Sequence, residues 1–111
     1  MDFAPAGPVP KEKIELFLSC RKLKNMDYSS KSDAFCMLFF GDNSGKSWIK
    51  MGETEVQDNT LNPDFAKSFI VDYFFEKVQN IRVDVFDKDP SKLDYIGSLF
   101  TTLGKVAGAR N

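Results

Sequence analysis

The chain has 111 residues, enough for one domain of ordinary size, and it is 42% hydrophobic and 28% charged. This balance is typical of a globular domain and argues against a disordered chain. Its 15 basic and 16 acidic residues give a net charge of −1, which removes the electrostatic argument for nucleic-acid binding. The absence of His excludes catalytic schemes that need a His base and any His-ligated zinc site.

Residues 1–11 contain Pro5, Pro8 and Pro10 between small residues, and this composition predicts a flexible leader. The segment lacks the apolar run of a signal peptide, so we expect an intracellular chain. A single domain is therefore expected over residues 12–111.

Six segments beyond the leader have the alternation, or the β-branched and aromatic content, of β-strands. They are residues 14–20, 35–40, 48–56, 68–75, 81–86 and 96–103. The segment FCMLFF is apolar on both faces, which suits a central strand, and EKVQN could add one helical turn. Because turn-forming stretches separate these segments, the sequence predicts an all-β antiparallel sandwich.

Both cysteines, Cys20 and Cys36, lie in apolar runs. Free cysteines are often buried, and intracellular proteins rarely hold disulfides. We therefore expect two reduced core thiols, with a disulfide between them as the alternative.

Eleven of the 16 acidic residues are Asp, a residue type that favours turns and caps over strand interiors. Two loops between predicted strands gather them: one carries Asp27 and Asp33, the other Asp87, Asp89 and Asp94. Calcium prefers six to eight oxygen ligands and needs neither His nor Cys. Like charges also repel, so a cluster of these carboxylates is unfavourable unless a cation neutralises it.

The alternative is that each Asp only solvates its loop or forms a turn with its own backbone. Neither loop fits the calcium loop of an EF-hand. Calcium is favoured only if both loops lie at the same end of the sandwich.

The chain resembles a C2 domain, and most closely the first C2 domain of the copines. The matching stretches are IELFLSCRKLKNMDYSSKSDAF, TEVQDNTLNPDFAKSFIVDYFF, IRVDVFDKD, LDYIGS and TTLGKV. The resemblance implies an eight-stranded sandwich, of the topology called type II, whose calcium loops share one end. The last strand of that fold is missing from the sequence, so the chain is expected to be a fragment of a longer copine-like protein or a short paralogue.

The resemblance also implies a set of metal ligands. By matching position, they are the carboxylates of Asp27, Asp33, Asp87, Asp89 and Asp94, with Ser91 as an auxiliary ligand and the backbone carbonyls of Met26 and Lys88 as additions. Three loop-tip residues, Tyr28, Pro90 and Leu93, lie beside these ligands and are expected to contact a membrane.

The function this implies is calcium-dependent binding of anionic phospholipid by a non-enzymatic cytoplasmic module that is recruited to membranes, the plasma membrane first among them. The alternative is a calcium-independent adaptor for protein partners on the same sandwich. A weaker basic contact, through Lys46 and Lys50, is opposed by Glu53 and Glu55 nearby. Because a missing strand exposes an edge or a strip of core, we also expect marginal stability and a tendency to dimerise or aggregate.

Overall fold

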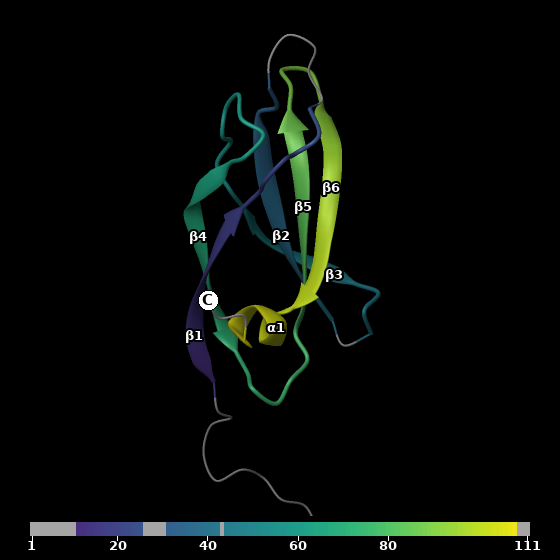
Figure 1. Ribbon diagram of the computed structural model, residues 1–111. Coiled ribbons are helices and arrows are strands. Elements are labelled where there is room, and N and C mark those ends of the chain that lie inside the picture. Colours follow the sequence, from purple (N-terminus) through teal and green to yellow (C-terminus); the bar gives the residue numbers. More distant parts are fainter. Residues whose placement is uncertain (1–10, 26–30, 43, 109–111) are drawn as a thin grey trace, which may run out of the picture.

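The computed structural model describes residues 11–25, 31–42 and 44–108, which form an antiparallel β-sandwich with one short helix (Figure 1). In chain order the elements are β1 (Glu12–Ser19), β2 (Ala34–Gly41), β3 (Trp48–Glu53), β4 (Asp64–Tyr73), β5 (Asn80–Lys88), β6 (Leu93–Thr102) and α1 (Leu103–Gly108). No helix among these residues has the length and apolar character needed to cross a bilayer.

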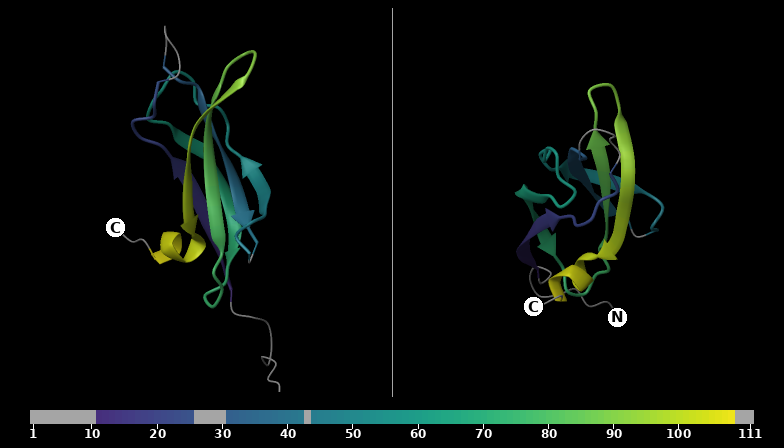
Figure 2. Two further views of the ribbon diagram at one scale, coloured as in Figure 1. Left: turned by 90° about the vertical axis from the view of Figure 1, so that its right-hand side faces the viewer. Right: turned by 45° about the horizontal axis from the view of Figure 1, so that its top comes forward.

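The strands form two layers, seen from two further sides in Figure 2. One sheet has four strands in the order β3-β2-β5-β6, and the other pairs β1 with β4. Every pairing is antiparallel, which confirms the predicted sandwich. The leader lies outside the described residues, except for Lys11, and its flexibility stays a prediction.

The core lies between the two layers and draws on both sheets and on α1. Its buried members are Leu16, Cys36, Leu38, Phe65, Phe69, Val71, Ile81, Val83 and Leu103. Burying each large aliphatic or aromatic side chain contributes roughly 1.5–3 kcal/mol of hydrophobic free energy. The two sheets approach closely beside Gly52, where an added Cβ would lie 2.9 Å from the Phe69 ring.

The apolar segment in residues 35–40 is central, as predicted, because β2 pairs with β3 on one side and β5 on the other. Its outer face is also covered. Phe35 stacks on Phe86 with ring centroids 5.8 Å apart, and the Arg82 guanidinium lies 4.1 Å from the centre of the Phe39 ring.

The predicted helical turn at residues 76–80 is wrong. Residues 74–79 form a turn, in which the Gln79 side chain accepts from Phe74 N–H and donates to the Asp72 carbonyl. These contacts replace the backbone bonds of a helix. The helix that does form, α1, escaped prediction because six residues are too few to show helical periodicity.

Strand boundaries also differ from those predicted, most at the end of the third strand and at the starts of the fourth and the sixth, which begins at Leu93 instead of residue 96. The third strand ends at Glu53 instead of residue 56, although Thr54 N–H still donates to the Cys36 carbonyl and Gln57 forms an isolated bridge with Ala34, so the segment stays beside β2 without regular pairing. The fourth begins at Asp64, four residues earlier than predicted, because Asp64 already pairs with Ser19 of β1.

The inner face of β6 is poorly covered within the described residues. Leu99 is the cross-strand partner of Val83 and shares its face, yet Leu99 is 59% exposed and Val83 only 7%. A two-stranded layer cannot cover a four-stranded one, so Leu99 on β6 is left facing solvent. Whether this exposed side chain causes dimerisation or aggregation stays a prediction.

Candidate functional site

Three stretches that are distant in the sequence meet at one end of the sandwich, the upper end in Figure 1. We call this the acidic end and define it by residues 31–33, 57–60 and 87–94. Lys31 N–H donates to the Asn59 side-chain oxygen at 2.8 Å, and Thr60 N–H donates to the Ser32 carbonyl at 3.0 Å. The described part of the first acidic loop is therefore fixed against the connection between β3 and β4.

Asp33 and Asp87 are in direct contact, although they come from different predicted loops. Asp33 N–H donates to Asp87 Oδ1 at 2.8 Å, and the Asp33 carbonyl accepts from Lys88 N–H at 2.8 Å. The Asp33 carboxylate in turn accepts from Asn59 N–H at 2.6 Å. The two acidic loops thus lie at the same end, which was the condition on which the calcium interpretation depended.

Asp87 is the most unusual residue at this end. It follows Ile81 and Val83 on the inner face of β5 and is only 1% exposed. Its Oδ1 is bonded to Asp33 N–H, whereas its Oδ2 is buried without a hydrogen-bond partner among the described residues. Burying a carboxylate oxygen without a partner is costly, because the charge loses its hydration.

Asp94 adds a second charge beside Asp87. The two are direct cross-strand partners in the β5–β6 pair, so their side chains lie on the same face of the sheet. Like charges at such positions are destabilising. The ion pair of Asp94 with Lys92 is long, 3.5 Å, and largely exposed on the lysine side, so it compensates little of this repulsion.

Asp89 lies in the hairpin turn and contacts Ser91. Its Oδ1 accepts from both the backbone N–H and the hydroxyl of Ser91, each at 3.1 Å. These bonds, with a smaller contribution from Lys92, hold the pKa of the Asp89 carboxyl below its ordinary value. Asp89 therefore shapes its own turn, as the alternative interpretation expected of a loop aspartate.

The structure does not place the full predicted ligand set. Met26, Asp27 and Tyr28 lie outside the described residues. Within the part of the chain that is described, no three acidic, Cys or His side chains converge closely enough to hold a metal ion. Convergence of all five aspartates stays a prediction, as do the ligand roles of Ser91 and the Lys88 carbonyl.

The described donors nevertheless suit a hard cation. All are oxygens, the atoms that calcium prefers over nitrogen and sulfur. The buried Asp87 Oδ2 has a free acceptor position, and the Asp94 carboxylate is beside it. Both features are unfavourable without a positive charge and favourable with one.

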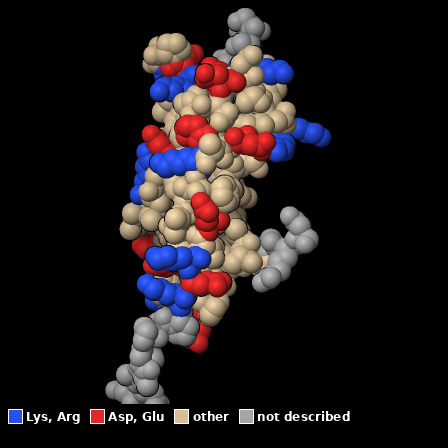
Figure 3. All heavy atoms as spheres, turned by 90° about the vertical axis from the view of Figure 1, so that its left-hand side faces the viewer, with Lys and Arg blue, Asp and Glu red and all other residues tan. Residues whose placement is uncertain are grey.

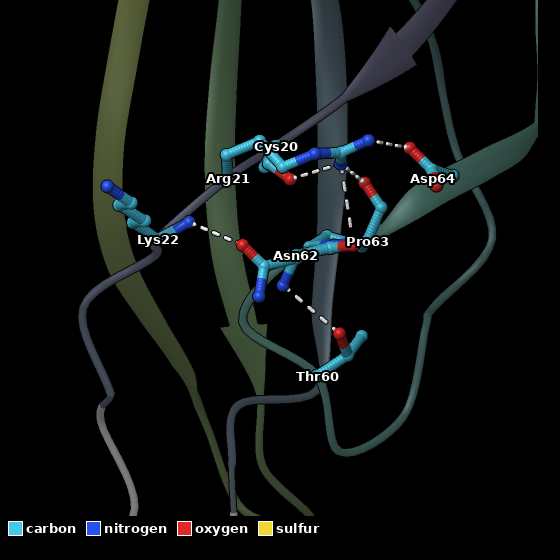
Figure 4. Close-up of polar contacts among 7 residues, drawn as sticks. All are labelled: Cys20, Arg21, Lys22, Thr60, Asn62, Pro63 and Asp64. Carbon is cyan, nitrogen blue, oxygen red and sulfur yellow. Dashed lines mark hydrogen bonds and ion pairs between the residues drawn. The ribbon is translucent and has the colours of Figure 1, made fainter.

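The base of the first acidic loop is tied to the segment that starts β4 (Figure 4). Arg21 forms an ion pair with Asp64 at 2.7 Å, and Lys22 N–H donates to the Asn62 side-chain oxygen at 2.9 Å. Lys22 adopts a positive φ of 55°, an uncommon conformation for a lysine, which these bonds help to hold.

Two residues that organise the acidic end were missed from the sequence. Asn59 links Lys31 to Asp33 and has a positive φ of 53°; the Asp-Asn pair within a turn-rich stretch was the available signal, because Asn tolerates this conformation. Glu55 accepts from the N–H groups of Ala66 and Lys67, at 2.6 and 3.1 Å, and so joins the two sheets. No local pattern could indicate that partner.

The charges elsewhere are mixed in sign. Figure 3 shows acidic and basic side chains interspersed over the face formed by β1 and β4. Lys11 and Lys13 both pair with Asp72 there. On β3, Lys50 forms an ion pair with Glu53 at 3.1 Å, which weakens the basic contact considered from the sequence.

Comparison with known proteins agrees with the β-sandwich fold. The C2 domain family matches residues 16–111. Among curated proteins, Copine-B of Dictyostelium discoideum is 40% identical over 110 residues and Copine-D of the same organism 34%. These alignments cover 91% and 92% of this chain but 21% of each copine, so the chain spans about a fifth of the length of these relatives.

Solved structures show the same fold at lower identity. A structure titled BON1-C2B is 22% identical with a TM-score of 0.68, and covers 89% of this chain and 69% of its own. Calcium-bound Extended-Synaptotagmin 2 is 21% identical with a TM-score of 0.64, over 91% of this chain and 37% of its own. Human GIVD cytosolic phospholipase A2 is 17% identical with a TM-score of 0.67, over 86% of this chain and 12% of its own. The chain belongs to the C2 domain family, and its sequence is similar to those of copines.

Proposed function

We propose that this chain is a calcium-dependent phospholipid-binding module that docks on anionic membrane surfaces through its acidic end. The observation that carries the proposal is Asp87, a buried carboxylate whose Oδ2 has no hydrogen-bond partner among the described residues and whose cross-strand neighbour is another aspartate. Such an arrangement is unfavourable for a residue with a purely structural role and is suited to a cation with oxygen ligands.

The charge of the acidic end explains why membrane binding would depend on calcium. Without a cation, the carboxylates of Asp33, Asp87, Asp89 and Asp94 repel an anionic leaflet. Calcium held by them, together with Asp27, would neutralise this end and offer coordination to lipid phosphate or carboxylate oxygens.

The hairpin between β5 and β6 supplies an apolar contact beside these charges. Pro90 is exposed, and Leu93 is 48% exposed instead of packing wholly under the loop. Apolar and aromatic side chains at this position could enter the headgroup region once repulsion is removed. Tyr28 would join them, although it lies outside the described residues.

On this proposal the chain is a binding module and has no catalytic role. It would reside in the cytoplasm and move to membranes, the plasma membrane in particular, when calcium rises. Copines and Extended-Synaptotagmin 2, to which it is similar, support this proposal by family membership.

The test is co-sedimentation with vesicles of mixed phosphatidylserine and phosphatidylcholine, with calcium or with a chelator. We expect binding with calcium, none with chelator, and loss of binding in Asp87→Asn with Asp89→Asn. A charge-matched control combines Asp42→Asn, in the turn between β2 and β3, with Glu76→Gln, an exposed residue in the turn between β4 and β5. The control removes the same number of negative charges but none from the acidic end, so it should bind as the parent chain does.

Equal binding with and without calcium, or equal loss in both double variants, would contradict the proposal. The adaptor alternative would then gain support, since Phe17 and Ile70 are 67% and 68% exposed on neighbouring strands and offer an apolar contact to a protein partner.

A further inference from the structure

The two cysteines form a close pair that joins the two sheets. Cys20 directly follows β1 and Cys36 lies in β2, and their sulfur atoms are 4.0 Å apart. Both thiols are free. Cys36 is fully buried, whereas Cys20 is only partly buried.

The backbone at both cysteines is held in place. Cys20 N–H donates to the Pro63 carbonyl at 2.9 Å, and both residues are drawn in Figure 4. Cys36 N–H donates to Thr54 Oγ1 at 2.9 Å. A disulfide needs the sulfur atoms about 2 Å apart. The sulfurs must therefore approach by about 2 Å to form the bond.

The two thiols differ in their surroundings, and this difference indicates which of them reacts first with an oxidant. A hydrogen bond from Cys36 and the nearby Arg21 guanidinium lower the pKa of the Cys20 thiol against the effect of its burial. The same sulfur contact and burial raise the pKa of Cys36. The accessible sulfur is thus the one more readily ionised, and the buried sulfur remains a thiol beside it.

We propose that Cys20 and Cys36 form a reversible redox pair, in which Cys20 reacts with a hydroperoxide and Cys36 then closes a disulfide between the two sheets. The proposal rests on the 4.0 Å separation of the two sulfur atoms and on the exposure, which is partial for Cys20 and absent for Cys36. It is independent of calcium binding and goes beyond the family's membrane function.

The chemistry balances with hydrogen peroxide as the oxidant. The Cys20 thiolate attacks one peroxide oxygen, the O–O bond breaks, and the hydroxide that leaves takes up the proton lost by Cys20 to give water. The Cys36 sulfur then attacks the sulfenic sulfur of Cys20, the S–O bond breaks, and the departing hydroxide takes the Cys36 proton as a second water. Two electrons pass from the thiol pair to the peroxide.

The cross-link would have a structural consequence. It closes a loop over residues 20–36, which contains the whole first acidic loop, and it adds a covalent bond between the two layers. Closing a loop of this size restricts the unfolded chain, so the oxidised form should melt higher, by on the order of 10 °C.

The test is treatment of the reduced, folded chain with hydrogen peroxide, followed by thiol titration, intact mass and peptide mapping. We expect loss of both thiols, a mass lower by two hydrogen atoms, and a Cys20–Cys36 peptide within one chain. Dithiothreitol should restore both thiols and the original melting temperature.

Two matched variants separate the roles. Cys36→Ala should stop at a sulfenic acid on Cys20 that dimedone traps, because no second thiol is close enough to resolve it. Cys20→Ser should slow oxidation of the remaining buried Cys36 at least about tenfold. Circular dichroism checks that each variant folds. If a variant does not fold, peptide mapping of the oxidised parent chain decides whether the Cys20–Cys36 disulfide forms.

Persistence of both thiols in the folded parent chain under excess peroxide would overturn the proposal. Oxidation that ends in a sulfinic acid on Cys20, or in disulfides only between chains, would overturn it equally.

Discussion

The two ends of the sandwich are held together by different kinds of contact. At the end opposite the acidic end, Gln79 bonds to the backbone of Asp72 and Phe74, its carbonyl accepts from Leu103 N–H at 2.8 Å, and Leu103 fills the core. At the acidic end, the connections are joined through carboxylates, and one buried carboxylate oxygen, on Asp87, has no partner among the described residues.

The difference indicates which end is built for stability and which for binding. Neutral, satisfied hydrogen bonds and a buried leucine stabilise the fold without any ligand. A buried carboxylate oxygen without a partner and adjacent like charges destabilise it until a cation arrives. Substitutions should therefore weaken the chain at the first end and strengthen it, without calcium, at the second.

The largest effect is expected for Leu103→Ala. Leu103 is fully buried where α1 meets the core, so the change removes buried apolar surface and leaves a cavity. We expect the free energy of unfolding to fall by about 2–5 kcal/mol in a urea titration. Val106→Ala, on the same helix but 38% exposed, serves as the control and should cost far less. Equal effects of the two changes would mean that α1 does not close this end.

Asp87→Asn should have a smaller effect of opposite sign in calcium-free buffer. Asn retains an oxygen for Asp33 N–H, removes the charge on the unpartnered atom and ends repulsion with Asp94. We expect a gain on the order of 1 kcal/mol, measured by urea unfolding with a chelator present. Asp58→Asn, exposed at the same end, should change little. A clear loss of stability in Asp87→Asn would show that the charge has a partner and is structural.

Glu55→Gln should lower stability by an amount that depends on pH. Hydrogen bonds from Ala66 N–H, and then from Gln57 and Lys67, lower the pKa of the Glu55 carboxyl to about 2. A depressed pKa contributes stability above the ordinary glutamate pKa, and this contribution is lost as the pH falls toward 2. The stability difference between parent and Glu55→Gln should therefore shrink between about pH 5 and pH 2.

Thermal melts across this pH range measure that difference. Glu53→Gln is the control, since the contact of Glu53 is an exposed ion pair with Lys50. A difference between the parent and Glu55→Gln that stays constant with pH would show that the hydrogen bonds to Glu55 favour the charged and neutral forms equally.

The sequence predicted the strands well, because alternation and turn residues are local signals. The IRVDVF segment shows this, with Ile81 and Val83 buried and Arg82 and Asp84 paired on the other face of β5. The early start of β4 was missed because Asp64 pairs with Ser19, which is distant in the sequence. The helix was missed because six residues are too few to show helical periodicity.

The acidic end was only partly predictable, because some of its features are local in the sequence and others depend on distant contacts. Asp residues after strand ends identified the candidates, but only the contact of Asp33 with Asp87 brings the two loops together. Neither the burial of Asp87 nor the bridging role of Asn59 has a sequence signature. Both arise from the way three connections pack at one end.

The central claim is that the clustered carboxylates of the acidic end bind calcium. Calorimetric titration of calcium into the parent chain, and into Asp87→Asn with Asp89→Asn, tests it most directly. The account predicts saturable binding by the parent chain, with a higher melting temperature because calcium binds only the folded form, and neither effect in the variant. No heat of binding and no change in melting temperature in the parent chain, or the same binding in both proteins, would contradict it.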